Sequence, residues 1–394
     1  MDRRRFLNTS TTLAAATALS GCGQTESKPA ASGQTRWQDK PVRLHVGTQR
    51  GPTDEKMLLY LKRHGVNTVC GYPPKPPYPA RGYWEVGELS AMKELCDKHG
   101  ITIETVAAPF LSSSHIDREE RPSIMLGKEP ERQRDIDDIC KCIENVRAAG
   151  LPGIKYNMSI LGVVRTEREP GRGGTTYSAW SLQKAKASDK FPAETRAGKV
   201  DEATAWERIS HFVKNVIPVA HTNKVKMACH PHDPGMPPEG FENVVRVLGT
   251  PEGLYKMAGL HESPYHGFNL CLGTTAEMLQ DPKTQIHDVI RKLGGQKRIF
   301  NIHFRNIRGH RDEFVEVYPD EGDMLMPQVL RTLYEIDYPY MLMPDHMPQH
   351  PDDPGGRTAF AFAFGYINGL IQSLKFEIGQ PFDAPTSDDN WFPA

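Results

Sequence analysis

Residues 42–70 read VRLHVGTQRGPTDEKMLLYLKRHGVNTVC, and this stretch holds one complete strand–helix–strand unit. Val42–Val46 and Val66–Cys70 are short apolar runs of the kind that form buried strands. Between them, Thr53–His64 has the spacing of an amphipathic helix, which Gly65 ends. Two buried strands joined by a helix predict parallel pairing within one β-sheet.

The same unit recurs along the chain. Six further strands are predicted at Ile101–Ala107, Ile154–Tyr156, Lys226–Cys229, Gly267–Leu270, Arg298–Ile302 and Tyr340–Met343. A helical pattern follows each strand, and Thr358–Leu374 closes the series. Eight such units predict an α/β fold of the (β/α)8 TIM-barrel type over residues 41–375, with a long insertion at Gly162–Val200 after the fourth strand. An open doubly wound sheet is the rival, but the sequence has no Gly-rich phosphate loop to favour it.

Composition narrows the class of protein. The 394 residues carry 48 basic and 49 acidic side chains, so the net charge of −1 argues against a nucleic-acid partner. The apolar share of 38% is enough for a globular core. No apolar run has the ~18 residues that a membrane-spanning helix needs.

The first residues resemble an export signal. A basic start with Arg3-Arg4 and Phe6-Leu7 is similar to a twin-arginine signal, and Leu19-Ser20-Gly21-Cys22 is similar to a lipobox. We therefore expect a signal peptide at 1–21, a lipid on Cys22, a linker at 22–40 and a C-terminal tail at 376–394. The protein would then be exported by the twin-arginine route and anchored as a periplasmic or cell-surface lipoprotein. An uncleaved N-terminus with a chance arginine cluster is the alternative.

Potential metal ligands stand at the ends of the last four predicted strands. They are His230, Cys271, His303 and Asp345. Successive members are separated by about one βα unit, roughly 31 residues plus loops, so each falls at the carboxyl end of the next strand, where barrel enzymes build their active sites. Two imidazoles, a thiolate and a carboxylate suit a divalent transition metal. His232 could replace His230, and each residue alone could instead be a packed polar side chain.

These strand ends also carry a family resemblance. His230-Pro231-x-Asp233-Pro234, Cys271-x-Gly273, Ile302-His303-x-Arg305, Gly322-Asp323-Met324 and Pro344-Asp345-His346 together resemble the manganese-dependent mannonate dehydratases. The resemblance implies a xylose-isomerase-like barrel that removes water from D-mannonate to give 2-dehydro-3-deoxy-D-gluconate. It implies Mn²⁺, with Fe²⁺ as the alternative, held by His230, Cys271, His303 and Asp345, and a proton-transfer role for His346 beside Asp345.

Other residues are candidates for substrate contacts. Tyr156 and Arg165, on and after the fourth strand, could orient a sugar acid, and Arg165 could hold its carboxylate with two hydrogen bonds. The chain departs from the family at Met347-Pro348-Gln349 and in the Gly/Arg-rich loop after Arg165. Both departures bear on substrate contacts more than on metal ligands.

Two alternatives remain open at this point. One is a metal-dependent sugar isomerase or epimerase on the same barrel, which would typically use two glutamates, an aspartate and a histidine as ligands. The other is a non-catalytic carbohydrate-binding lipoprotein, which needs no metal. The expected partner is a small sugar acid, membrane contact is expected only through the lipid on Cys22, and the sequence leaves homo-oligomer formation open.

Overall fold

The computed structural model of the protein describes residues 40–78, 80–191, 194–236 and 238–381. The predicted signal peptide, the lipobox at Cys22 and the linker up to residue 39 lie outside the described residues, as do residues 382–394 of the predicted tail. In the part that is described, no helix is long and apolar enough to cross a membrane.

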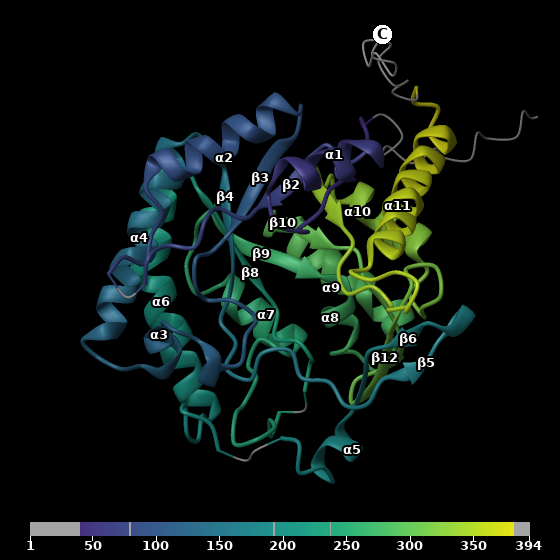
Figure 1. Cartoon of the computed structure of the whole chain (residues 1–394). Coiled ribbons are helices and arrows are strands. Elements are labelled where there is room, and N and C mark those ends of the chain that lie inside the picture. Colours follow the sequence, from purple (N-terminus) through teal and green to yellow (C-terminus); the bar gives the residue numbers. More distant parts are fainter. Residues whose placement is uncertain (1–39, 79, 192–193, 237, 382–394) are drawn as a thin grey trace, which may run out of the picture. The chain divides into compact units, whose positions relative to one another are not determined.

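Eight parallel strands form one sheet that curves into a barrel (Figure 1). They are β1 (His45–Val46), β2 (Thr68–Gly71), β3 (Thr102–Ala107), β4 (Gly153–Asn157), β8 (Lys226–His230), β9 (His266–Cys271), β10 (Ile299–His303) and β13 (Met341–Met343). Neighbours pair in the order β1-β13-β10-β9-β8-β4-β3-β2. Between β1 and β2 the seam is joined by a parallel bridge from Thr48 to Val69, where Cys70 N donates to Thr48 O at 2.8 Å. The predicted (β/α)8 barrel is confirmed.

The principal helices lie around the outside of the strands (Figure 1). They are α1 (Glu55–Arg63), α2 (Val86–Lys98), α4 (Glu131–Ala148), α6 (Glu202–Asn223), α7 (Pro251–Ala258), α9 (Pro282–Gly295), α10 (Met326–Glu335) and α11 (Arg357–Glu377). Two of them begin at an aspartate that caps the helix: Asp54 accepts from Met57 N, and Asp201 accepts from Thr204 N, both at 2.8 Å. Such a cap satisfies a backbone donor that the first helical turn leaves free.

The insertion after β4 is more ordered than its sequence pattern indicates. It contains β5 (Glu169–Pro170), β6 (Thr176–Tyr177), β7 (Ala179–Ser181) and α5 (Leu182–Lys186), together with the 3-10 turn η2 (Arg172–Gly174). The strand β7 pairs with a hairpin that the sequence analysis missed, β11 (Asn306–His310) and β12 (Glu313–Val317). Trp180 on β7 is buried against Phe241 in the segment after β8, with ring centroids 5.5 Å apart, so the insertion packs against the barrel through apolar side chains.

Three short helices complete the described chain. They are η1 (Ile116–Arg118), α3 (Ser123–Leu126) and α8 (Leu272–Ala276). The last of them starts directly after Cys271, whose Sγ accepts from Thr274 N at 3.4 Å. The helix thereby fixes the Cys271 side chain at the carboxyl end of β9.

Candidate metal centre

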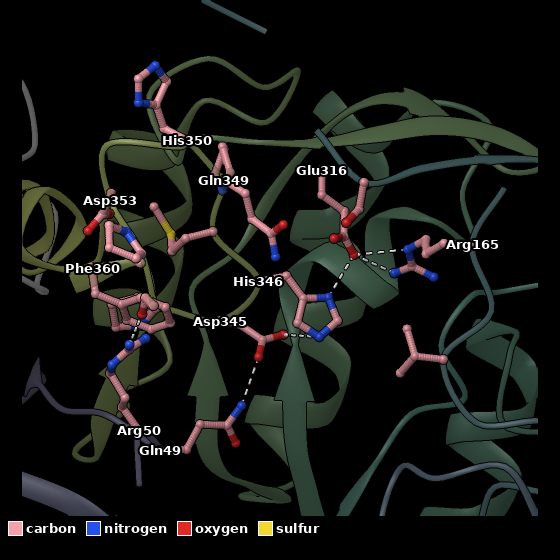
Figure 2. A pocket seen from close by; sticks show the side chains of 18 residues that line it. Gln49, Arg50, Arg165, Glu316, Asp345, His346, Gln349, His350, Asp353 and Phe360 are labelled. Carbon is pink, nitrogen blue, oxygen red and sulfur yellow. Dashed lines mark hydrogen bonds and ion pairs between the residues drawn. The ribbon is translucent and has the colours of Figure 1, made fainter. Parts of the chain in front are cut away.

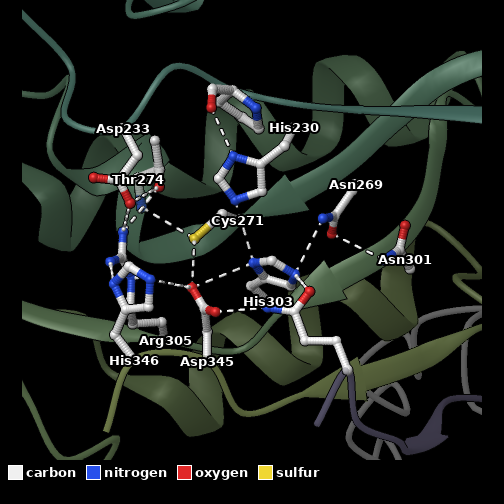
Figure 3. Close-up of polar contacts among 12 residues, drawn as sticks. His230, Asp233, Asn269, Cys271, Thr274, Asn301, His303, Arg305, Asp345 and His346 are labelled. Carbon is white, nitrogen blue, oxygen red and sulfur yellow. Dashed lines mark hydrogen bonds and ion pairs between the residues drawn. The ribbon is translucent and has the colours of Figure 1, made fainter. Parts of the chain in front are cut away.

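The four predicted ligands meet at the carboxyl ends of four neighbouring strands (Figure 3). His230, Cys271, His303 and Asp345 each offer one donor atom, these atoms all lie within 4.8 Å of one another, and all four residues are buried. Measured pairs are His230 Nε2 to His303 Nδ1 at 3.2 Å, His303 Nδ1 to Asp345 Oδ2 at 3.3 Å, and Cys271 Sγ to Asp345 Oδ2 at 3.8 Å. Donors bound at roughly 2.0–2.3 Å in a tetrahedral site lie roughly 3.3–3.8 Å apart, so the cluster has the size of a metal site.

Hydrogen bonds behind the cluster orient both imidazoles. The Nδ1 of His230 lies 2.6 Å from Pro231 O, which leaves Nε2 to face the other donors. The Nε2 of His303 lies 2.9 Å from Gln49 Oε1, which leaves Nδ1 to face them. Partners of this kind fix the tautomer of a metal-binding histidine.

Gln49, in the loop after β1, is a functional residue that the sequence analysis missed. Its Nε2 donates to Asp345 Oδ1 at 2.8 Å, while its Oε1 faces His303 and accepts from Lys155 Nζ at 2.5 Å. One amide thus holds two of the four ligands in place. Its position just beyond the first strand was the available signal, because all strand ends of a barrel meet at one face.

His230, rather than His232, presents a ring nitrogen to the cluster. Both ring nitrogens of His232 face backbone groups: Nε2 lies 2.8 Å from Met158 O, and Nδ1 accepts from Leu248 N at 3.3 Å. That ring therefore has no donor atom left for a metal.

The protonation states of two ligands suit metal binding. Burial lowers the pKa of His230 to about 4, so its imidazole is neutral near pH 7. Burial alone would raise the pKa of Asp345, but His303 and His346 outweigh it and hold this pKa well below its usual range. A neutral imidazole and an ionised carboxylate are the forms that bind a cation.

A network of arginines and carboxylates borders the metal cluster. Arg305 contacts Asp233 Oδ2 at 3.0 Å and Glu277 Oε1 at 2.8 Å, and it also pairs with Glu316. Arg165 shares the same three carboxylates. Burial and the charge of Asp233 raise the pKa of Glu277 well above its usual range, so two guanidinium groups face two ionised carboxylates.

Gly273 of the Cys271-x-Gly273 string leaves space for an arginine of this network. A Cβ at position 273 would collide with the Arg305 side chain, so a larger residue there would displace Arg305 from its partners. Arg305, which follows β10, is 2% exposed and joins the buried network.

His346 stands between the metal cluster and the network. Its Nδ1 lies 2.7 Å from both Glu316 Oε1 and Arg305 Nη1, and its Nε2 lies 3.9 Å from Asp345 Oδ2. Its side chain is 37% exposed, and it lines a cavity of about 670 Å³ (Figure 2). The predicted proton-transfer residue thus faces space that a substrate could occupy.

The prediction that Tyr156 orients the substrate is not supported by its position. Tyr156 pairs in register with Cys229 on β8, whereas Asn157 pairs with His230. Alternate residues of a strand point to opposite faces, so Tyr156 points away from the face that His230 occupies. Its ring packs on Phe212 of α6, with centroids 5.3 Å apart. The sequence placed Tyr156 at the correct strand end but could not give its side.

Two early-strand residues lie away from the cluster. His45 Nε2 contacts Glu104 Oε1 at 2.6 Å, and both residues line a different cavity, which includes Val42 and Lys375. Neither residue approaches the four metal ligands closely enough to join that group.

Comparisons with known proteins agree with this geometry. Residues 189–379, which include all four predicted ligands, match the family described as UxuA, D-mannonate dehydratase. A mannonate dehydratase of Streptococcus agalactiae is 26% identical over 325 residues, covering 75% of this chain and 88% of that protein. Mannonate dehydratase 2 of Halalkalibacterium halodurans is 25% identical over 357 residues, covering 82% of this chain and 97% of that protein.

Solved structures show the same fold. The crystal structure of mannonate dehydratase from Streptococcus suis superposes with a TM-score of 0.74 at 23% identity, covering 88% of this chain and 99% of that one. A xylose isomerase domain protein from Planctomyces limnophilus superposes with a TM-score of 0.53 at 14% identity. The match covers 86% of this chain and 98% of that one.

Fold and site together define a xylose-isomerase-like TIM-barrel protein with a buried cluster suited to a metal ion. Within that class, the chain is similar over 75–82% of its length to D-mannonate dehydratases, and this similarity supports an enzyme of the lyase class.

Proposed function

We propose that this enzyme is a metal-dependent dehydratase that converts D-mannonate to 2-dehydro-3-deoxy-D-gluconate. The observation that carries the proposal is the buried group of His230, Cys271, His303 and Asp345, which lies inside the segment that matches the D-mannonate dehydratase family. The mannonate dehydratases of S. agalactiae and H. halodurans, which are similar over most of their length, support the substrate.

The elimination of water needs two proton transfers. A base removes the proton at C2, and an acid protonates the C3 hydroxyl so that it leaves as water; the resulting enol takes up a proton at C3 and becomes a 2-keto acid. A divalent metal held by the four ligands would supply a Lewis acid that stabilises negative charge on substrate oxygens. His346 is the residue that we assign to one of the two transfers, because its ring faces the cavity beside Asp345 and is held by Glu316.

We propose Mn²⁺ as the resident metal, with Fe²⁺ as the alternative. The mixed nitrogen, sulfur and oxygen donor set accepts several first-row divalent ions, so the donors alone do not choose between them. Activity of the metal-free protein reconstituted with each ion separately would distinguish the two.

The donor set also bears on the competing functions. A sugar isomerase or epimerase of this fold would be expected to place glutamates among its ligands, but the four-donor cluster contains none. A non-catalytic carbohydrate-binding protein has no need of a buried metal cluster. Both alternatives are therefore less well supported than the dehydratase.

The test is to incubate manganese-loaded full-length protein with D-mannonate and to assay for a 2-keto-3-deoxy acid. We expect product from the unmodified chain and a loss of at least roughly 100-fold in kcat for His346→Asn, with manganese content retained. Isomerised sugar from an aldose and ketose panel, without product from mannonate, would overturn the proposal in favour of an isomerase.

We also propose that the chain is exported and carries a lipid on Cys22, on the strength of its N-terminal sequence. Radiolabelled palmitate should enter the unmodified chain and not Cys22→Ser. Arg3→Lys combined with Arg4→Lys should retain the protein in the cytoplasm; unlabelled protein that stays in the cytoplasm in every case would contradict export.

A further inference from the structure

We propose that Arg50 is the residue that binds the carboxylate of the sugar acid, the role that the sequence suggested for Arg165. This inference rests on the proposed function, because it assumes an acidic substrate in the cavity beside the metal cluster. It assigns a specificity-determining contact to the loop between β1 and α1.

Arg165 lines the cavity, but its guanidinium is already engaged. Its Nη2 contacts Asp233 Oδ1 at 2.5 Å and Glu277 Oε1 at 3.4 Å, its Nε donates to Glu316 Oε1 at 3.1 Å, and its Nη1 donates to Val164 O at 2.9 Å. All three nitrogens therefore have partners. A substrate carboxylate would have to displace a buried carboxylate from Arg165. The displaced carboxylate would then keep its negative charge in the interior without its full share of positive charge, which is unfavourable.

The histidines of the cavity are engaged as well. His346 is held by Glu316 and Arg305. His350 faces Asp352, with Nδ1 at 3.5 Å from the carboxylate. Neither ring offers the paired donors that match the two oxygens of a carboxylate.

Arg50 has donor capacity left. Its Nη2 donates to Gly355 O, and its Nε is buried with no hydrogen-bond partner among the described residues. Nor does any carboxylate of the described chain form an ion pair with it. The charge of Asp353 acts on Arg50, but the oxygens of Asp353 accept from Thr358 N and Ala359 N at 2.9 Å at the start of α11. A bound carboxylate would supply the missing counter-charge.

The Arg50 side chain is also preorganised. Its guanidinium carbon lies 4.4 Å from the centroid of the Phe360 ring, which holds the planar group from one side. An aromatic face stabilises a guanidinium while leaving the nitrogen atoms at its edge free to donate. Less conformational freedom is then lost when a ligand binds.

The position of Arg50 relates it to the metal cluster. Its neighbour Gln49 donates to the ligand Asp345, and both Gln49 and Arg50 line the same cavity. Figure 2 shows Arg50 and Phe360 on one side of Asp345 and His346, with Arg165 and Glu316 on the other side. A sugar acid between them would place its charged end at Arg50 and its hydroxyl-bearing carbons toward the ligands and His346.

The test compares D-mannonate with D-mannonamide, its neutral amide, for binding to manganese-loaded full-length protein by calorimetry. The unmodified chain should prefer the acid, and Arg50→Gln should lose roughly 10-fold to 100-fold of that preference while binding the amide as before. Arg50→Lys, which keeps the charge without the planar fork, should fall between the two. Arg43→Gln, at an exposed arginine paired with Asp337, is the matched control and should keep the full preference.

Other outcomes separate this inference from the proposed function. If Arg50→Gln retains the preference for the acid, the inference fails while the dehydratase proposal stands. If mannonate is not dehydrated but a panel of other aldonates binds in an Arg50-dependent way, the substrate assignment fails and the role of Arg50 stands. Absence of aldonate binding to the unmodified chain overturns both.

Discussion

The Sγ of Cys271 lies 3.8 Å from Oδ2 of Asp345, although 74 residues separate them along the chain. The two side chains come from the ends of β9 and β13, with β10 between them in the sheet. Because parallel strands present their carboxyl ends at one face, a thiol and a carboxylate so distant in sequence share one small buried space. A cation bound to both groups would account for this closeness.

Replacing Cys271 tests this relationship. Cys271→Ser should lower manganese affinity by more than the roughly 10-fold to 100-fold that is typical of losing an outer-shell partner, because a ligand itself is weakened. Metal content after dialysis, measured by mass spectrometry, gives the result. Cys140→Ser, on the outer helix α4, is the control and should keep the metal. Full metal content in Cys271→Ser would contradict the ligand assignment.

Replacing Gln49 tests the support of the cluster. Gln49→Leu removes the hydrogen bonds to Asp345 and His303 without removing a ligand. We expect manganese affinity to fall roughly 10-fold to 100-fold, the range for outer-shell partners. Titration of metal-free protein would measure this change. Gln183→Leu, at an exposed position on α5, should bind the metal as the unmodified chain does, and an equal effect in both variants would refute the role of Gln49.

Replacing Tyr156 tests the correction to the sequence prediction. Its hydroxyl lies beside the Cys229 thiol, on the side of β4 that faces α6. Tyr156→Phe should therefore leave kcat and KM for mannonate within about twofold, and the free energy of unfolding within about 1 kcal/mol. Steady-state kinetics and urea unfolding measure both. A large loss of kcat in a stable Tyr156→Phe variant would instead support the substrate-contact role that the sequence predicted for Tyr156.

Acid should destabilise the protein through His266. Burial lowers the pKa of this residue to about 4, and its Nδ1 lies 3.3 Å from His261 O. In the unfolded chain the pKa is about 6.5. Between these values the unfolded chain binds the extra proton, so the free energy of unfolding decreases as the pH falls, by at most about 1.4 kcal/mol per pH unit.

The variant His266→Gln should flatten this dependence between pH 6.5 and pH 4. Urea unfolding at several pH values gives the slope. His310→Gln, at an exposed histidine of the β11–β12 hairpin, should leave the slope unchanged. Identical slopes for His266→Gln and the unmodified chain would show that the native state does not exclude the proton.

The sequence by itself determined the barrel and picked out the four residues whose donor atoms meet at its carboxyl end. Buried parallel strands are marked by apolar runs, and the residue that ends each run is read directly, as at His303 and Asp345. The family strings added the reaction class. The sequence could not distinguish His230 from His232, because the difference depends on which ring forms hydrogen bonds with the backbone of Met158 and Leu248.

Only the tertiary structure decided how the remaining side chains are used. Tyr156 and its neighbours alternate between two faces, and a shift of one residue reverses their direction. The sequence alone does not distinguish the roles of Arg165 and Arg50. In the structure, three carboxylates from distant segments surround Arg165, whereas Arg50 packs on a phenylalanine ring. Long-range packing brings those partners together, and contacts of this kind cannot be predicted from a local sequence pattern.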